Sequence, residues 1–216
     1  MSDSTSKPLT EMTAINVAKV VTILFLMGLA LVYGISDQRQ VIYLCLHIGY
    51  CSWWLFEQWL LPARSRQLFT ETVSYWALIP AIAFVGLFYA LPGYFAFTNP
   101  EPIGYLSVAI ALPLFMFGSL INTAADVQKM VAKEQGVTLV KDGAWRYIRH
   151  INYLGDLMRY SSFPVVAGVP WAFVVSVAIF LLYLGRVIDK EASMANKYED
   201  FSDYKAVSVR LIPFIW

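Results

Sequence analysis

The segment RYIRHINYLGDL, residues 146–157, combines cationic, amide, phenolic and carboxylate side chains next to a long apolar run. Arg149, Asn152 and Asp156 recur at spacings of three and four residues, which place them on one face of an α-helix, and Tyr153 flanks that face. An Asp that faces lipid costs about 2.5–3.5 kcal/mol even on the lenient insertion scale. We therefore expect this polar face to point at protein, water or a ligand.

Two further stretches carry side chains of the same chemical kinds. Lys129 and Lys133 are four residues apart, so they share one helical face and form a pair of point charges suited to a phosphate. The tail KYEDFSDYKAVSVRLIPFIW, residues 197–216, is amphipathic and aromatic and ends in an apolar stretch. We expect residues 188–216 to form a folded lid over a cationic pocket at the membrane surface. Such a pocket suits an anionic cofactor and a lipid-soluble substrate.

The composition indicates whether the chain folds in water or in a membrane. Of 216 residues, 58% are hydrophobic and 14% are charged, which is far from the composition of a soluble domain and predicts an integral membrane protein. A helix needs about 20 apolar residues to cross a bilayer. The runs of that length predict membrane helices at residues 14–35, 41–61, 73–91 and 103–124.

A fifth apolar block, residues 153–187, is too long for one straight crossing. Pro164, Gly168 and Pro170 lie in its middle and predict two short helices joined by a tight turn. Basic residues support this hairpin, because residues 126–152 and 186–216 hold ten of them whereas residues 92–102 hold none. The positive-inside rule then predicts a multi-pass protein with both termini cytoplasmic.

The predicted fold is therefore an all-α polytopic membrane bundle of about six transmembrane helices, including the C-terminal hairpin, with a cytoplasmic C-terminal lid. Residues 1–125 form its four-helix membrane region and residues 126–216 its cofactor-binding region. The sequence contains no HExxH, Walker, GxSxG or Rossmann motif. We expect no metal site and no nucleic-acid partner.

For two ionisable residues, Asp156 and Glu57, an ion pair without a role in function remains an alternative to a functional site. Asp156 and Arg159 have the spacing of an intrahelical ion pair. Glu57 lies on one face of the second helix with His47, which marks a functional site inside a membrane, but it also lies close enough to the helix end to reach Arg64 or Arg66.

The motifs resemble those of the sterol reductase family. GAWRYIRHINYLGDL, residues 143–157, is similar to that family's pattern of glycine, an aromatic pair, Arg-His and Asn-Tyr-x-Gly-Asp, and the tail is similar to its closing Lys-Tyr and Arg-x-Ile-Pro segments. DVQK, residues 126–129, followed by Lys133, resembles its Asn-x-Gln-Lys and Arg. The resemblance covers about residues 122–216. The wider superfamily includes steroid 5α-reductases and isoprenylcysteine carboxyl methyltransferases.

The resemblance implies an NADPH-dependent reductase and a set of site residues. Lys129 and Lys133 would hold the 2′-phosphate, Arg186 would face the pyrophosphate or the nicotinamide end, and Tyr204 would donate a proton near the reacting carbon. The implied catalytic residues are Tyr204 and Glu191. The implied cofactor-binding residues are Lys129, Lys133, Trp145, Arg149, His150, Asn152, Tyr153, Asp156, Arg186, Lys197, Tyr198 and Arg210.

Several positions depart from the family pattern. The family's Arg-Asp-Glu cluster is replaced by Asp189, Lys190 and Glu191, an expected His is Gly185, and the Gly after Lys-Tyr is Glu199. These changes affect the catalytic acid more than the cofactor site. The chain is also shorter than the usual members, so the substrate cavity would be assembled differently or shared with a partner chain in a homo-oligomer.

Three classes of function follow. The first is an NADPH-dependent reductase of a carbon–carbon double bond in a sterol, isoprenoid or similar lipid. The second is a membrane methyltransferase that uses S-adenosylmethionine, and the third is a non-catalytic membrane subunit. Lys129 and Lys133 favour the phosphorylated cofactor, for which a methyltransferase has less need.

Overall fold

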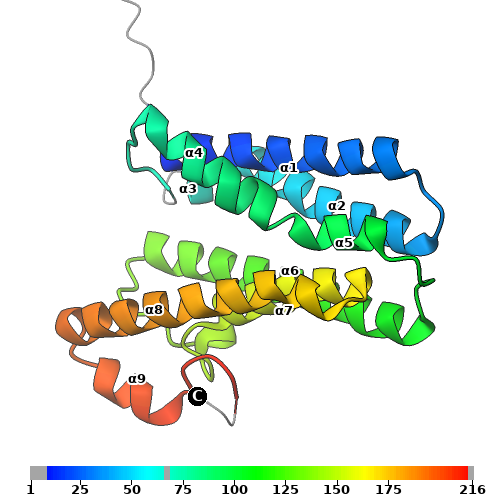
Figure 1. Ribbon diagram of the computed structural model, residues 1–216. Helices are drawn as coiled ribbons and strands as arrows, with labels where there is room; N and C mark the ends of the chain where they lie inside the picture. Colours follow the sequence, from blue (N-terminus) through cyan, green and yellow to red (C-terminus); the bar gives the residue numbers. More distant parts are fainter. Residues whose placement is uncertain (1–8, 66–68, 214–216) are drawn as a thin grey trace, which may run out of the picture. The chain divides into compact units, whose positions relative to one another are not determined.

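Every regular element in residues 9–65 and 69–213, the parts of the chain that the computed structural model describes, is helical (Figure 1). Helices satisfy their backbone hydrogen bonds internally, which a chain surrounded by lipid requires. The chain divides into two units, residues 1–102 and residues 103–216. The functional division predicted after residue 125 lies inside a helix of the second unit and stays a prediction.

The first unit is built from two long helices and one composite helix. Its elements are α1 (Glu11–Tyr33), α2 (Gln38–Leu60), α3 (Pro62–Ser65), η1 (Tyr75–Ala77), α4 (Leu78–Pro80), η2 (Ala81–Phe88) and α5 (Leu91–Thr98). Asp37 begins α2 with a capping box in which its side chain accepts backbone N–H donors and Gln40 bonds back to the Asp37 backbone. α1 packs against η2, α2 and α5.

Polar side chains are buried between the helices of this unit. Lys19 is buried, and its Nζ donates to the Tyr50 hydroxyl at 3.1 Å. The Tyr43 hydroxyl lies 2.9 Å from Nδ1 of His47. Glu57 is buried as well, while the side chains of Arg64 and Arg66 lie outside the described residues. The expected contact of Glu57 with these arginines therefore stays a prediction.

The second unit carries the motifs. Its elements are α6 (Tyr105–Glu134), η3 (Gly143–Trp145), α7 (Ile151–Ala167), η4 (Pro170–Phe173), α8 (Val174–Lys197) and α9 (Phe201–Val207). The break predicted between Pro164 and Pro170 is confirmed: α7 ends at Ala167, and the next residue, Gly168, has a φ of 73°, a left-handed conformation that favours glycine. The chain then turns through η4 into α8, which packs against α7.

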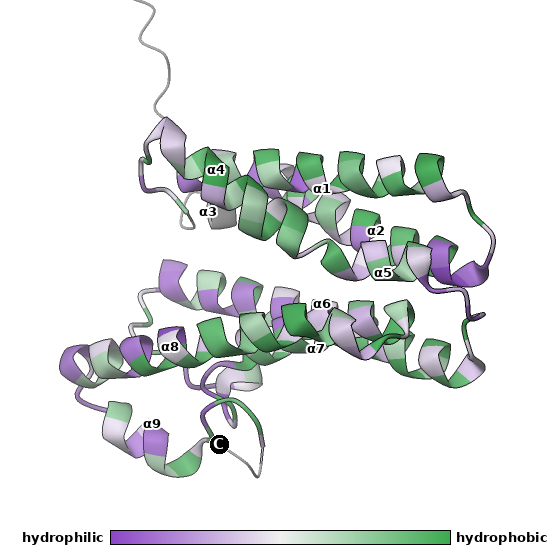
Figure 2. Ribbon diagram, in the orientation of Figure 1, coloured by the Kyte–Doolittle hydropathy of each residue, from purple (hydrophilic) through white to green (hydrophobic). Residues whose placement is uncertain are grey.

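Four described helices are long and apolar enough to cross a membrane: residues 11–33, 75–98, 105–134 and 170–197. Figure 2 shows the apolar residues along their middles and hydrophilic residues at the ends of α6 and α8. The protein is an integral membrane protein on these grounds. The count of about six crossings and the cytoplasmic position of the termini stay predictions, because α2 and α7 are not among these four helices.

α6 and α7 cross at two glycines, which allows their backbones to touch. A Cβ added to Gly155 would lie 2.7 Å from the Gly118 carbonyl oxygen and 2.8 Å from the Asn122 backbone nitrogen. A Cβ on Gly118 would lie 2.6 Å from the Gly155 carbonyl oxygen. The glycine of the Asn-Tyr-x-Gly-Asp motif therefore fixes the position of α7 against α6.

Gly155→Ala is expected to lower the free energy of unfolding by about 1–3 kcal/mol, the usual cost of forcing atoms into a packed contact. Thermal unfolding of the purified protein in detergent measures the change. Gly185→Ala is the matched control, because a Cβ at Gly185 in α8 has no neighbour within 4 Å. The control should unfold at the same temperature as the unmodified protein or slightly higher, and equal losses in both variants would contradict the close crossing.

Candidate functional site

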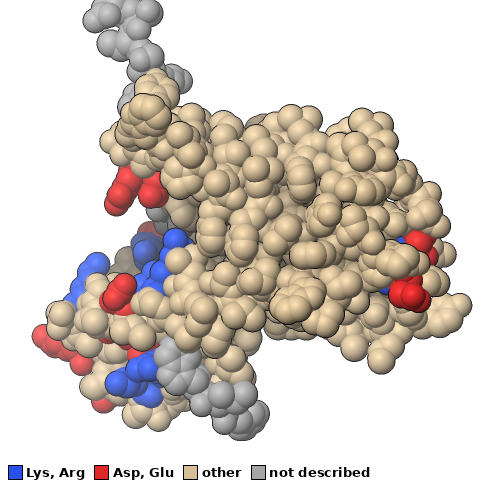
Figure 3. All heavy atoms as spheres, in the orientation of Figure 1, with Lys and Arg blue, Asp and Glu red and all other residues tan. Residues whose placement is uncertain are grey.

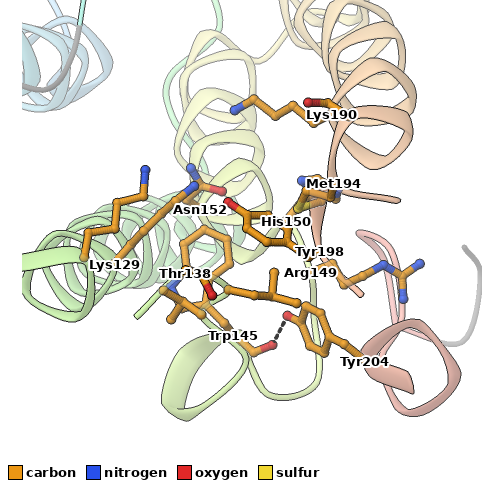
Figure 4. Close-up of a pocket in the computed structure, with 14 residues that line it drawn as sticks. Lys129, Thr138, Trp145, Arg149, His150, Asn152, Lys190, Met194, Tyr198 and Tyr204 are labelled. Carbon is orange, nitrogen blue, oxygen red and sulfur yellow. Dashed lines mark hydrogen bonds between the residues drawn. The ribbon is translucent and has the colours of Figure 1, made fainter. Parts of the chain in front are cut away.

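A cavity of about 200 Å³ lies in the second unit, lined by residues of α6, the connection to α7, α7, α8 and α9 (Figure 4). Eight residues expected from the sequence line it: Lys129, Lys133, Trp145, Arg149, His150, Asn152, Tyr198 and Tyr204. Six others do not line it: Tyr153, Asp156, Arg186, Glu191, Lys197 and Arg210. We call this cavity the lysine pocket.

The DVQK segment attaches the wall of the pocket to α6. The Gln128 side chain donates to the Asp142 carbonyl at 2.8 Å and accepts from the Ala144 backbone N–H at 3.0 Å. Gly143, between them, has a φ of 58°, and a Cβ there would lie 2.3 Å from Gln128 Nε2. Asn152 Nδ2 donates to Asp126 Oδ1 at 3.2 Å. Gln128 and Asp126 thus fix the loop and the beginning of α7.

Trp145 supplies an aromatic wall. Its indole Nε1 donates to the Ala125 carbonyl at 3.1 Å, and its ring lies 5.1 Å from Nζ of Lys129. The Tyr204 hydroxyl donates to the Trp145 backbone carbonyl, as the dashed line in Figure 4 shows. Burial raises the pKa of Tyr204 to about 12, so this hydroxyl keeps its proton at neutral pH.

Glu191 lies outside the lining of the pocket and connects three segments of the chain through ion pairs. Its Oε1 accepts from Arg149 Nε at 2.8 Å and its Oε2 accepts from Arg210 Nε at 2.8 Å. The side chains of Arg149 and Glu191 are 5% and 7% exposed. Glu191 therefore connects α8, the segment before α7 and the tail, and both of its oxygens are engaged.

Arg149 also attaches the tail through backbone groups. Its Nη1 donates to the carbonyl oxygens of Ser208 and Lys205, and its own N–H donates to the Val209 carbonyl at 2.9 Å. In Figure 4 the Arg149 guanidinium points away from the lysines, toward the tail. The tail thus forms part of the pocket wall, whereas its role as a lid that opens and closes stays a prediction.

His150 contributes a neutral ring to the pocket. Its Nε2 lies 3.5 Å from Glu191 Oε1 and forms no hydrogen bond with the described residues. Burial lowers the pKa of His150 to about 4, and the charges of Lys190 and Arg149 act in the same direction against the opposing effect of Glu191. The positive charge of the pocket at neutral pH therefore comes from its lysines and not from this histidine.

Tyr153 and Asp156 lie outside the lining of the pocket and contact Tyr183 of α8. The Tyr153 ring stacks on the Tyr183 ring, with centroids 4.4 Å apart, and the Tyr183 hydroxyl donates to Asp156 Oδ2 at 2.9 Å. Asp156 also pairs with Arg159, so the intrahelical pair is present. Both residues stabilise the packing of α7 against α8, and direct contact with a cofactor stays a prediction for them.

Arg186 and Lys197 are exposed on α8, outside the lining of the pocket. Lys190 was not predicted to be a binding residue. It lines the pocket together with Ser193 and Met194 of the same helix. A signal was present, because Lys190 and Met194 are four residues apart and Tyr198 follows after four more, the spacing of one helical face. Lys190 makes three lysines in the pocket.

These lysines take part in none of the ion pairs found among the described residues of the unit, which are Lys141–Asp200, Arg149–Glu191, Arg210–Glu191 and Asp156–Arg159. Figure 3 shows charged side chains, many of them basic, at the end of this unit where α8 and α9 meet. The pocket therefore lies at the charged end of apolar helices, and its three lysines are not held in these ion pairs.

Comparison with known proteins gives related sequences. A family described as "Protein of unknown function (DUF1295)" matches residues 62–210, more than half of the chain. A Delta(14)-sterol reductase of Arabidopsis thaliana is 22% identical over 166 residues, which cover 69% of this chain and 45% of the relative. A Delta(14)-sterol reductase of Methylotuvimicrobium alcaliphilum is 36% identical over 92 residues, covering 41% of this chain and 22% of the relative.

A 7-dehydrocholesterol reductase of Danio rerio is 36% identical over 84 residues, covering 36% of this chain and 17% of the relative. The chain spans less than half the length of each of these curated relatives. The resemblance to sterol reductases predicted from the motifs is confirmed. By the match over residues 62–210, the chain belongs to the DUF1295 family, and its relatives include sterol reductases.

Proposed function

We propose that this protein is an NADPH-dependent reductase of a carbon–carbon double bond in a sterol, isoprenoid or related lipid. The observation that carries the proposal is the lysine pocket, in which Lys129, Lys133 and Lys190 meet aromatic walls at the charged end of membrane helices. The sterol reductase relatives support the reaction class.

The pocket residues fit a phosphorylated nucleotide. Ammonium groups without carboxylate partners bind phosphate oxygens through charge-assisted hydrogen bonds. Lys129 and Lys133 lie four residues apart on α6 and would hold the 2′-phosphate, while the Asn152 amide would bind ribose or amide groups. Pockets for drug-sized ligands are usually about 300–1,000 Å³. The cavity of about 200 Å³ would therefore enclose only part of a dinucleotide.

The same charges disfavour the methyltransferase alternative. S-adenosylmethionine carries no phosphate, and its sulfonium and ammonium cations outweigh its one carboxylate, so three nearby ammonium groups would repel its net positive charge. A neutral His150 does not change this balance, since its pKa is lowered to about 4 by burial.

NADPH, when bound, supplies the hydride for one carbon of the double bond, and the other carbon needs a proton. Tyr204 remains the proposed donor because its hydroxyl is protonated, although a pKa of about 12 makes it a weak acid. To act, the hydroxyl would have to exchange the Trp145 carbonyl for the substrate. Glu191 is a positioning residue in this proposal, since arginines occupy both of its oxygens.

A turnover assay tests the proposed function. The purified protein in lipid vesicles is incubated with NADPH and, separately, sterols and polyisoprenoids with reducible double bonds, and the lipids are analysed by mass spectrometry. We expect one lipid class to gain two hydrogen atoms while an equal amount of NADPH is consumed. A parallel incubation with S-adenosylmethionine should add no methyl group. Methyl transfer without any reduction would contradict the proposal.

A further inference from the structure

Lys190 lies on a different helix from Lys129 and Lys133, and Figure 4 shows it reaching into the same pocket from α8, whereas Lys129 reaches in from α6. Its Nζ lies 4.8 Å from the centre of the Tyr153 ring. That ring is held by its stack on Tyr183, which is hydrogen-bonded to Asp156. The Tyr153 ring therefore provides an aromatic seat for the exposed Lys190 side chain.

Lys129 has a seat of the same design. Its Nζ lies 5.1 Å from the centre of the Trp145 ring, which is fixed by its hydrogen bond to the Ala125 carbonyl. A cation over an aromatic face is held by about 0.5–1 kcal/mol at exposed sites, and the ring does not cancel its charge. Burial lowers the pKa of Lys129 to about 8, so this group is still mostly protonated at neutral pH. A carboxylate partner would instead cancel the charge. Both ammonium groups are thus positioned and still able to attract an anion.

Glu191, which follows Lys190 in the sequence, does not neutralise the Lys190 charge. The Glu191 side chain points about 100° further around α8 than the Lys190 side chain. It binds Arg149 and Arg210, each at 2.8 Å. Lys129 and Lys190 are close enough that their charges repel each other. An anion in the pocket removes this repulsion. If Lys129 and Lys133 of α6 hold one phosphate, the third lysine, which comes from a separate helix, is available to a second anionic group.

We propose that the two seats bind two different anionic groups of one nucleotide: Lys129, with Lys133, holds the 2′-phosphate, and Lys190 holds the pyrophosphate. This assignment rests on the proposed function, because it requires a phosphorylated dinucleotide.

Three probes separate the two seats: NADPH carries both anionic groups, NADH carries only the pyrophosphate, and adenosine 2′-monophosphate carries a phosphate only at the 2′ position. Affinities are measured by calorimetric titration of the full chain in detergent. Lys190→Gln should weaken NADPH and NADH by the same factor, about tenfold for one charge-assisted contact. It should weaken adenosine 2′-monophosphate by a clearly smaller factor, since Lys190 attracts that phosphate only through its charge and not by direct contact. Lys129→Gln should weaken NADPH and adenosine 2′-monophosphate and spare NADH.

Lys205→Gln is the control, since it removes an exposed lysine of α9 outside the lining of the pocket. It should bind all three probes as the unmodified protein does. If Lys190→Gln weakens adenosine 2′-monophosphate as much as NADPH, Lys190 belongs to the 2′-phosphate seat and the assignment is wrong. If it changes no affinity while Lys129→Gln still does, the proposed function stands and the inference alone fails. If the unmodified protein binds no NADPH, the proposed function itself fails.

Discussion

Glu191→Gln is expected to lower the free energy of unfolding by about 3–5 kcal/mol, the usual cost of removing one partner from a buried ion pair. Glu191 is bound by Arg149 and Arg210 at 2.8 Å each, and the Arg149 side chain is 5% exposed. The substitution leaves the Arg149 charge buried beside a neutral amide. Glutamine has nearly the size of glutamate, so the loss reports the missing charge and not a cavity.

The tail should loosen in the same variant, because Arg149 also binds the carbonyl oxygens of Lys205 and Ser208. Thermal unfolding gives the stability change, and trypsin cleavage after Lys205 or Arg210 in the folded protein reports the tail. Glu199→Gln is the control, since Glu199 is an exposed glutamate in the segment between α8 and α9. A Glu191→Gln protein with unchanged stability and unchanged tail cleavage would show that the ion pairs do not hold the tail.

Much of the fold follows from the sequence because it depends on local properties. Apolar runs of bilayer length predicted the long helices, and the Pro164–Pro170 segment predicted the end of α7, where Gly168 adopts a φ of 73°. The contact of Gly118 with Gly155 could not be predicted in this way. It depends on the register between two helices, which periodicity within each helix does not determine.

Residues that line the pocket could be predicted only where a sequence motif contains them. Lys129, Asn152 and Trp145 line the pocket as expected, since their motif places them at its wall. Along α8 the sequence did not show which residue faces inward. Lys190 enters the pocket, while its neighbour Glu191, about 100° further around the helix, binds two arginines instead. That difference depends on the rotation of α8 against α7, which tertiary packing determines.

Replacing Lys129 and Lys133 together by alanine is expected to weaken NADPH binding at least about tenfold and to leave NADH binding nearly unchanged. Charge-assisted contacts contribute about 1.5–3 kcal/mol each, and only NADPH carries the phosphate that these lysines would neutralise. Lys133 is exposed, so its contribution to the binding free energy is expected at the lower end of that range. Calorimetric titration with both nucleotides measures the ratio of affinities.

The matched control for this double variant is Arg146→Ala with Lys205→Ala, which removes the same charge from two exposed residues outside the lining of the pocket. It should keep the preference for NADPH. A similar loss of both nucleotides in the Lys129 and Lys133 variant would show that these lysines do not recognise the 2′-phosphate.

Nucleotide-dependent unfolding of the unmodified protein tests the central claim, that the lysine pocket binds NADPH, most directly. A ligand present at one hundred times its Kd stabilises the folded state by about 2.7 kcal/mol. Thermal unfolding in detergent is followed during separate titrations with NADPH, NADH and S-adenosylmethionine. We expect NADPH to raise the unfolding temperature at the lowest concentration, NADH to require more, and S-adenosylmethionine to have no effect. Stabilisation by S-adenosylmethionine, with none by NADPH, would contradict the account.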